Sequence, residues 1–297
     1  MVLPGDFDTE RHVTRRSLSG QPFGGPRLET RGCRAECGRL YSGAMALLKA
    51  YEPAAFLLER PEAQSPFVLT CDHASLRIPE ALGDLGVSAA ERERHIAWDI
   101  GALAVARGLM RALDATLIST GYSRLVIDAN RPPGRFDAVP EKSEATEIPG
   151  NRGLPQAAIA LRQRALFDPY HAAISSLLDA RLAAGRPVIF IAIHSFTPEY
   201  LGQSRPWQVA LLSHRDRRLT DWMLAALRQD PALCVGDNTP YRVTDEGDYG
   251  IPVHAERRGL PHLLIELRQD LIAEPAGQGV WIERLASLLK TAPRFQP

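Results

Sequence analysis

Four apolar runs of this sequence are each followed by polar side chains of types that can carry out chemistry. These polar residues are Asp72-His73, Asp128 with Asn130-Arg131, His194-Ser195, and Glu266. Ligands of open parallel sheets bind beyond the carboxyl ends of the strands, so these positions are candidates for a functional site. Imidazole and carboxylate are ligands of catalytic zinc, and an Asn-Arg pair can hold a substrate carboxylate. The set indicates metal-assisted hydrolysis, with Glu266 suited to taking a proton from water.

Each of these residues also has an ordinary structural interpretation. A single buried histidine is more often a hydrogen-bonded core residue than a ligand, and Glu266 could pair with Arg268. For Arg124, a surface charge and a contact to an anion or oxyanion are equally acceptable interpretations. Cys71 lies close to His73, but a thiol nucleophile is disfavoured because catalytic pairs usually come from separate segments. For Tyr241, packing is preferred over lining a pocket.

The elements that must position these residues alternate between short apolar runs and stretches of helical spacing. This alternation predicts an α/β domain with a largely parallel sheet. The predicted strands cover 67–71, 116–119, 125–127, 187–193, 208–212 and 262–266, with 187–193 at the centre of the sheet. The predicted helices cover 100–113, 161–182 with an interruption at Asp168-Pro169, 217–228 and 280–289. Segment 132–155 is expected to be a long loop, either a lid or a surface excursion.

Composition narrows the functional classes. Of the 297 residues, 45% are hydrophobic and 24% charged, which is typical of a globular protein. Lys and Arg number 35, as do Asp and Glu, so charge gives no reason to expect nucleic acid or an anionic membrane as partner. No apolar run is long enough to span a membrane, and the amino terminus lacks the features of a secretory signal. Together with only four cysteines, these features favour a cytoplasmic location.

Residues 1–44 differ from the rest of the chain. They are rich in Gly, Pro, Arg and Ser and lack apolar periodicity, so we expect a disordered or non-native extension before a single catalytic domain over 45–297. Cys33 and Cys37 are interpreted as free cysteines of this extension rather than as a zinc knuckle, because no second Cys or His pair follows nearby.

The motifs in combination resemble the N-formylglutamate amidohydrolase family. The segments that carry the resemblance are 68–75, 122–132, 192–195 and 258–270, within a region that extends from about 50 to 289. The resemblance implies a three-layer α/β/α sandwich with a mostly parallel, mixed central sheet of the phosphorylase/hydrolase-like kind, similar to zinc carboxypeptidases and aspartoacylases. It also implies metal-dependent hydrolysis of N-formylglutamate to formate and glutamate.

Residue by residue, the resemblance implies one zinc ion per chain, bound by His73 and His194. It makes Glu266 the general base, and Asn130 and Arg131 the clamp on the substrate carboxylate. Arg124 is a candidate for stabilising the oxyanion. His254, in a loop bounded by Gly and Pro, is a weaker candidate for contacting substrate.

The third metal ligand is where this sequence departs from its carboxypeptidase-like relatives. Those proteins take an acidic ligand three residues after the first histidine, and that position here is Leu76, which cannot coordinate a metal. Asp99 is the preferred substitute, with Asp72 as the next option. An ordinary helix cap is an equally acceptable interpretation of Asp99.

These inferences lead to one functional hypothesis and one alternative. The hypothesis is a metal-dependent amidohydrolase that acts on a small N-formyl or N-acyl amino acid with a free carboxylate. The alternative is a non-catalytic binding protein that uses the same fold, and Arg131, to hold a carboxylate ligand. The acyl group, the amino acid, the physiological metal and the oligomeric state are left open by the sequence.

Overall fold

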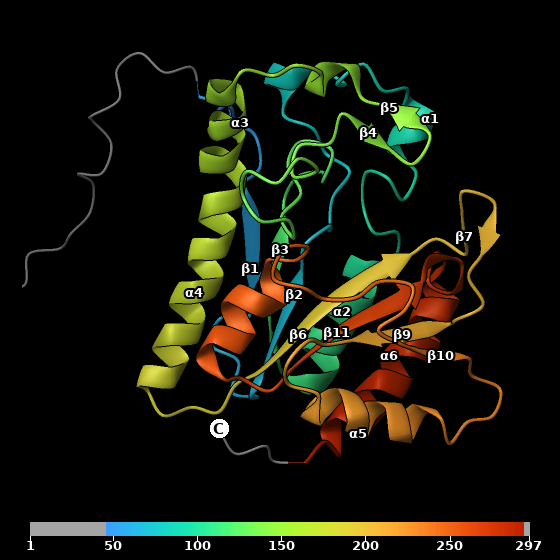
Figure 1. Ribbon diagram of the computed structural model, residues 1–297. Coiled ribbons are helices and arrows are strands. Elements are labelled where there is room, and N and C mark those ends of the chain that lie inside the picture. Colours follow the sequence, from blue (N-terminus) through green and yellow to red (C-terminus); the bar gives the residue numbers. More distant parts are fainter. Residues whose placement is uncertain (1–45, 294–297) are drawn as a thin grey trace, which may run out of the picture. The chain divides into compact units, whose positions relative to one another are not determined.

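A mixed sheet of seven strands, in the order β1-β3-β2-β6-β11-β9-β10, forms the centre of the fold (Figure 1). The four strands β3, β2, β6 and β11 are parallel to one another. β1 is antiparallel to β3, β9 is antiparallel to β11, and β10 is parallel to β9. The strands are β1 (Phe56–Glu59), β2 (Phe67–Cys71), β3 (Thr116–Thr120), β6 (Ile189–Phe196), β9 (Val209–Leu212), β10 (Val235–Asp237) and β11 (His262–Arg268).

Helices cover both faces of this sheet. One face packs against α2 (Ala102–Leu113), α5 (Arg218–Leu227) and α6 (Pro275–Lys290), and the other against α4 (Asp168–Ala183) and a π-helical segment (Gly250–Ala255). Because side chains alternate along a strand, Leu69 and Cys71 enter the first layer while Val68 enters the second. The predicted three-layer α/β/α architecture with a mostly parallel sheet is confirmed.

The remaining elements are short. They are α1 (Ala89–Arg92), α3 (Gln156–Arg162), a π-helical segment (Gln163–Phe167), the hairpins β4 (Lys142–Ser143) with β5 (Thr146–Glu147) and β7 (Glu199–Tyr200) with β8 (Gln203–Ser204), and 3-10 turns at Glu80–Leu82, Pro149–Asn151, Glu256–Arg258 and Gln269–Leu271. Segment 132–155, expected as a loop, therefore contains a small hairpin and a helical turn.

Two expectations about local structure are corrected. Residues 125–127 do not form a strand: the Val126 amide donates to the Ser123 carbonyl within a turn, and the apolar side chains enter a separate outer cluster. The run is too short for its apolar character to distinguish a strand from a buried turn. The helical stretch is not broken at Pro169, because the π-helical segment continues directly into α4 with that proline in its first turn.

The structure describes residues 46–293. The chain divides into two units, Met1–Ala44 and Met45–Pro297, so the expectations for the amino-terminal extension and for Cys33 and Cys37 lie outside the described residues. Within 46–293, no helix combines the length and the apolar character needed to cross a membrane.

Candidate active site

The candidate residues gather at the carboxyl ends of the parallel strands. His73 lies two residues beyond β2, His194 lies in β6, and Glu266 lies in β11 with its Cα paired in register with that of His194. His194 and Glu266 share a strand face with Ala192 and Leu264, which pack in the same layer as α4. The topology therefore brings residues from three strands together at one end of the sheet.

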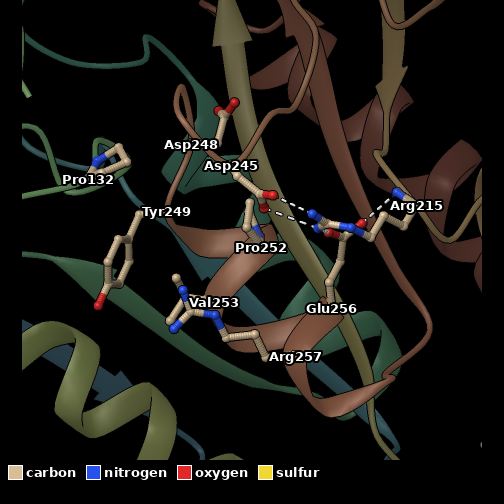
Figure 2. Close-up of a pocket in the computed structure, with 9 residues that line it drawn as sticks. All are labelled: Pro132, Arg215, Asp245, Asp248, Tyr249, Pro252, Val253, Glu256 and Arg257. Carbon is tan, nitrogen blue, oxygen red and sulfur yellow. Dashed lines mark hydrogen bonds and ion pairs between the residues drawn. The ribbon is translucent and has the colours of Figure 1, made fainter.

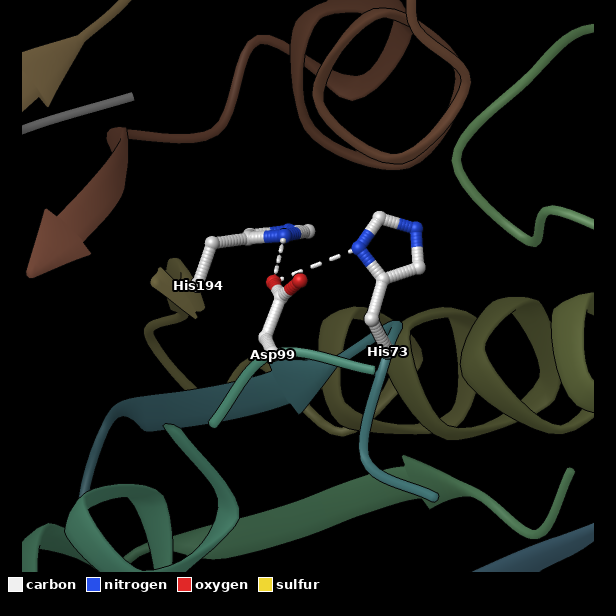
Figure 3. Close-up of side chains that lie close together, drawn as sticks. All are labelled: His73, Asp99 and His194. Carbon is white, nitrogen blue, oxygen red and sulfur yellow. Dashed lines mark hydrogen bonds and ion pairs between the residues drawn. The ribbon is translucent and has the colours of Figure 1, made fainter. Parts of the chain in front are cut away.

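Asp99 lies between the two histidines (Figure 3). Its Oδ2 is 2.9 Å from Nδ1 of His194 and 3.2 Å from Nδ1 of His73, and all three side chains are buried. Their possible ligand atoms all lie within 4.8 Å of one another. This is a donor set of two imidazole nitrogens and one carboxylate, which suits a divalent metal such as zinc.

The backbone around Asp99 explains its orientation. Helix α2 begins at Ala102, and its N-cap is Gly101, with a left-handed φ of 79° and no side-chain cap. A Cβ at Gly101 would collide with the carbonyl of Ile272, so glycine is required there. The interpretation of Asp99 as an ordinary helix cap is therefore wrong, because its carboxylate faces the histidines instead.

Each histidine also contacts a second carboxylate through its other ring nitrogen. Nε2 of His73 lies 2.8 Å from Asp128, and Nε2 of His194 lies 3.1 Å from Asp72. The Tyr170 hydroxyl in turn donates to Asp72. Metal-binding histidines commonly donate their second N–H to a carboxylate, which fixes the ring and its tautomer. Asp72, the other option for third ligand, thus lies on the side of His194 away from Asp99.

The buried cluster has an excess of negative charge. Burial alone would raise the pKa of Asp99 and Asp72, but the neighbouring histidines hold the pKa of Asp99 far below its usual range and lower that of Asp72 to about 2. Burial opposes protonation of His194, yet Asp72 and Asp99 raise its pKa well above the ordinary value. Carboxylates that stay ionised in the interior need compensating positive charge, which protons on the histidines or a bound divalent cation can supply.

Glu266 differs from the other carboxylates of the site. It is 7% exposed, and its Oε2 has no hydrogen-bond partner among residues 46–293. Burial raises the pKa of Glu266 to about 7. A carboxyl group with a pKa near neutrality can accept and return a proton at physiological pH, as general acid-base catalysis requires. The alternative ion pair with Arg268 is not formed, because Arg268 pairs with Asp270.

Arg124 is held against the cluster. Its guanidinium donates to Oδ2 of Asp128 at 2.6 Å and lies 3.5 Å from Oδ1 of Asp99. Burial would lower the pKa of Arg124, but Asp128 and Asp99 raise it above its usual value, so the side chain is a permanent cation here. This placement favours a role at the site over a plain surface charge.

Asn130 and Arg131 are occupied by contacts to the segment that follows β10. Asn130 donates to Asp248 at 3.0 Å and accepts from the backbone amides of Tyr249 and Gly250. Arg131 donates to the carbonyl of Gly247 and lies 3.7 Å from Asp248. Both side chains therefore fix this segment, and the carboxylates of Asp137 and Asp248 compete with a substrate carboxylate for the guanidinium of Arg131.

His254 is buried, and both of its ring nitrogens lie within hydrogen-bond distance of another side chain. Nε2 of His171 lies 2.8 Å from the carbonyl of Ala129, which can only accept, so the Nδ1 of His171 accepts in turn from Nε2 of His254 at 2.8 Å. Ser175 completes the chain at the remaining nitrogen of His254, at 3.4 Å. This arrangement leaves His254 no ring nitrogen for substrate.

Two cavities lie outside the metal-ligand cluster itself. The larger, of about 530 Å³, is lined by Pro132, Arg215, Asp245, Asp248, Tyr249, Pro252, Val253, Glu256 and Arg257 (Figure 2). Arg215 pairs there with Asp245 and Glu256, so both acids of the second group of possible metal ligands, which also includes His214, already have a cationic partner. The smaller cavity, of about 410 Å³, includes Ile100 and Thr197, which follow Asp99 and His194 closely in the chain.

The sequence marked Asp128 as one of the polar residues after an apolar run without giving it a role, and it gave no indication of Tyr170. Asp128 contacts both His73 and Arg124, and its position in the same strand-end motif as Asn130 was a usable signal. Tyr170 reaches Asp72 from α4, 98 residues away in sequence, and no local pattern identifies such a contact.

The fold and site together define an α/β/α protein with a buried histidine-carboxylate cluster at the carboxyl ends of its parallel strands. The family model described as N-formylglutamate amidohydrolase matches residues 65–273. The chain belongs to this family, and it is accordingly a hydrolase that acts on amide bonds. The resemblance seen in the sequence is thereby confirmed, and the enzyme is favoured over the non-catalytic binding protein.

Two solved structures are similar to this chain. A gene product of Agrobacterium tumefaciens is 41% identical, with a TM-score of 0.80, and the match covers 83% of this chain and 97% of that one. An N-formylglutamate amidohydrolase from Ralstonia eutropha is 23% identical, with a TM-score of 0.58, over 81% of this chain and 97% of that one, and supports the fold alone. No protein with a curated functional description matches the sequence.

Proposed function

We propose that the protein is a zinc-dependent amidohydrolase that cleaves the amide bond of an N-formyl or N-acyl amino acid with a free carboxylate. The observation that carries the proposal is Asp99 facing Nδ1 of both His73 and His194, with Glu266 opposite His194 on the next strand. The family name supports an N-formylglutamate-like substrate. The composition supports a cytoplasmic location as part of the same proposal.

His73, His194 and Asp99 would hold the metal. Their atom types fit zinc, and the carboxylates Asp72 and Asp128 would fix the two imidazole rings. When bound, such an ion lowers the pKa of a coordinated water to about 7 and polarises a carbonyl oxygen. The negative charge of the cluster supports a cation at this position.

The side chains around the metal ligands would move the protons. Glu266 accepts a proton from the attacking water at its unpartnered Oε2 and returns it to the amine that leaves. Arg124, held by Asp128, donates a hydrogen bond to the oxygen that gains negative charge as the amide carbon becomes tetrahedral. Asn130 and Arg131 position the segment around Gly247, and His254 is linked through His171 to the carbonyl of Ala129, the residue before Asn130.

Metal content measured by elemental analysis tests this proposal. We expect about one zinc per chain in the wild type, a loss of that zinc in His73→Ala and in His194→Ala, and hydrolysis of N-formyl amino acids by the wild type. The matched control is His214→Ala, because His214 belongs to the group beside Arg215 and should not affect zinc content. A wild type that stays free of metal after zinc supplementation, or a His214 variant that loses zinc, would refute the assignment.

A further inference from the structure

Arg205 is a buried cation that lacks an acidic partner among the described residues. It directly follows β8, and only 9% of its surface is exposed. A guanidinium has five N–H donors, yet within 46–293 the side chain donates one hydrogen bond, to the Tyr241 hydroxyl at 2.8 Å. Buried charges are normally paired, because leaving water costs several kcal/mol per ion. Arg124 and Arg131 contrast with Arg205, since each faces two carboxylates.

Two aromatic rings hold the Arg205 guanidinium in place. Its central carbon lies 4.7 Å from the ring centre of Tyr200, in the β7–β8 hairpin, and 4.9 Å from that of Tyr241. Cation-π contacts of this kind stabilise the charge without consuming its N–H donors. The result is an oriented guanidinium with unused donors, the arrangement that binds a carboxylate in a bidentate manner.

The backbone places Arg205 beside the smaller cavity. Its amide donates at 2.8 Å to the carbonyl of Pro198, and the flanking residues Thr197 and Glu199 both line this cavity. Gln269, three residues beyond Glu266, lines the same cavity from the 3-10 turn that directly follows β11. The cavity therefore adjoins the carboxyl ends of the two strands that carry His194 and Glu266.

Tyr241 lies close to both Arg205 and the proposed general base Glu266. Burial and the charge of Glu266 raise the pKa of the Tyr241 hydroxyl, while Arg205 and Arg124 lower it. The hydroxyl is therefore close enough to Glu266, Arg205 and Arg124 to interact with each of them electrostatically. Gln269 lines the cavity with a buried Oε1 that has no hydrogen-bond partner within 46–293, while Nε2 of His95 lies 3.6 Å from Oε2 of Glu144. An unsatisfied buried atom such as Oε1 of Gln269 is expected where a polar ligand binds.

We propose that Arg205, oriented by Tyr241 and Tyr200, binds a carboxylate of the substrate and makes the enzyme selective for acidic over neutral amides. This inference rests on the proposed function, and it assigns to Arg205 the task that the sequence suggested for Arg131. The smaller cavity would then hold the amino-acid part of the substrate, with its scissile amide toward Glu266.

Kinetics with one acid and its two monoamides test the assignment. The substrates are N-formyl-L-glutamate, N-formyl-L-glutamine and N-formyl-L-isoglutamine, each of the last two lacking one carboxylate. We expect the wild type to prefer the acid over one of the monoamides by about 100-fold in kcat/KM, the size of a charge-assisted hydrogen-bond pair. In Arg205→Met this preference should fall below about threefold, because the variant keeps the apolar stem and loses the charge.

Two control variants separate the outcomes. Arg242→Met removes an exposed arginine one residue after Tyr241 and should retain the wild-type preference. Arg205→Lys keeps the charge and should restore part of the preference for the acid. A purely structural role for Arg205 would not produce this partial recovery. The inference is overturned if Arg205→Met keeps the preference for the acid, if it loses activity equally on all three compounds, or if Arg131→Met abolishes the preference instead.

Binding of L-glutamate, measured by calorimetry on the zinc-loaded protein, distinguishes this inference from the proposed function. We expect affinity to fall about 100-fold in Arg205→Met, with zinc content unchanged. If the wild type hydrolyses none of the amides but still binds L-glutamate through Arg205, the proposed function fails and the carboxylate site stands. If hydrolysis is observed and L-glutamate binds equally to wild type and Arg205→Met, the carboxylate site fails and the proposed function stands.

Discussion

His194 and Glu266 lie opposite each other on the neighbouring parallel strands β6 and β11, with their Cα atoms paired in register. A candidate metal ligand and a candidate base are thus fixed by two of the most deeply buried strands of the sheet. A shift of one residue in either strand would turn one of the two side chains to the opposite face. The sheet register itself therefore sets the relation between these groups.

Replacing Glu266 with glutamine should remove the base and leave the metal in place. We expect kcat to fall by about 10²- to 10⁴-fold, the usual contribution of a positioned general acid-base group. Zinc content and the melting temperature should stay close to wild type, since glutamine has nearly the same shape. Steady-state kinetics together with elemental analysis check this, and wild-type turnover by the variant would exclude Glu266 from the mechanism.

Asp99 and Asp72 should affect metal binding to different degrees. Asp99→Asn removes a proposed ligand, so we expect zinc to be lost on dialysis. Asp72→Asn should weaken zinc affinity only about 10- to 100-fold, because Asp72 contacts the outer nitrogen of His194. Competition with a chelator of known zinc affinity measures both. The reverse order of affinities would make Asp72 the third ligand.

Arg124 should contribute to kcat more than to substrate affinity. If its guanidinium stabilises the oxygen that becomes negatively charged, Arg124→Gln should lower kcat by about 10²- to 10³-fold with little change in KM. Arg217→Gln is a suitable control, because Arg217 pairs with Asp221 and Asp237 outside the cluster. A change confined to KM would instead indicate that Arg124 binds the substrate in its ground state.

A chelator should abolish activity, whereas a thiol reagent should leave it unchanged. Burial raises the pKa of the Cys71 thiol well above its usual value, so the group is neutral, and its side chain points into the layer of α2. Cys234 is exposed but lies in no part of the cluster. We expect EDTA to abolish hydrolysis and iodoacetamide to leave it unchanged. Inactivation by iodoacetamide that substrate prevents would contradict this expectation.

Stability should decrease in mild acid because of the pair His171 and His254. Burial lowers the pKa of His171 to about 4, and burial together with His171 lowers that of His254 to about 3. Unfolded histidines take up protons near pH 6.5, so below this pH the unfolded state binds more protons than the folded state. The free energy of unfolding should therefore fall as the pH drops from about 6.5 toward 4, by up to about 1.4 kcal/mol per pH unit for each histidine.

Denaturant unfolding of the wild type and of a variant carrying both His171→Gln and His254→Gln tests this effect. The charged groups that act on the pair are Asp72, Asp168 and Asp179, which favour protonation, and Arg258, which opposes it. The variant retains these groups, so the difference between the two curves isolates the histidines. Parallel curves between pH 6.5 and 4 would show that the pair does not titrate with folding.

The sequence by itself determined the class of fold and the family, and it marked the two histidines proposed as metal ligands. Strands 67–71, 116–119, 187–193, 208–212 and 262–266 were recognised, because buried strands require local apolar runs and such runs are visible in a single sequence. Polar residues that directly end such runs are equally local, which is why His73, His194 and Glu266 could be named. The short edge strands β1 and β10 were not predicted: β10 has only one large apolar residue, and β1 has an apolar run that is partly exposed in the structure.

Only the tertiary structure decided what each side chain faces. Asp99 rather than Asp72 lies between the histidines because a glycine turn before α2 directs it there. Arg131 contacts a loop more than a hundred residues away, while Arg205, which no motif marked, is a buried cation that donates one side-chain hydrogen bond among residues 46–293. Such contacts depend on strand order, register and side-chain direction, which join residues distant in the chain and leave no periodic trace in the sequence.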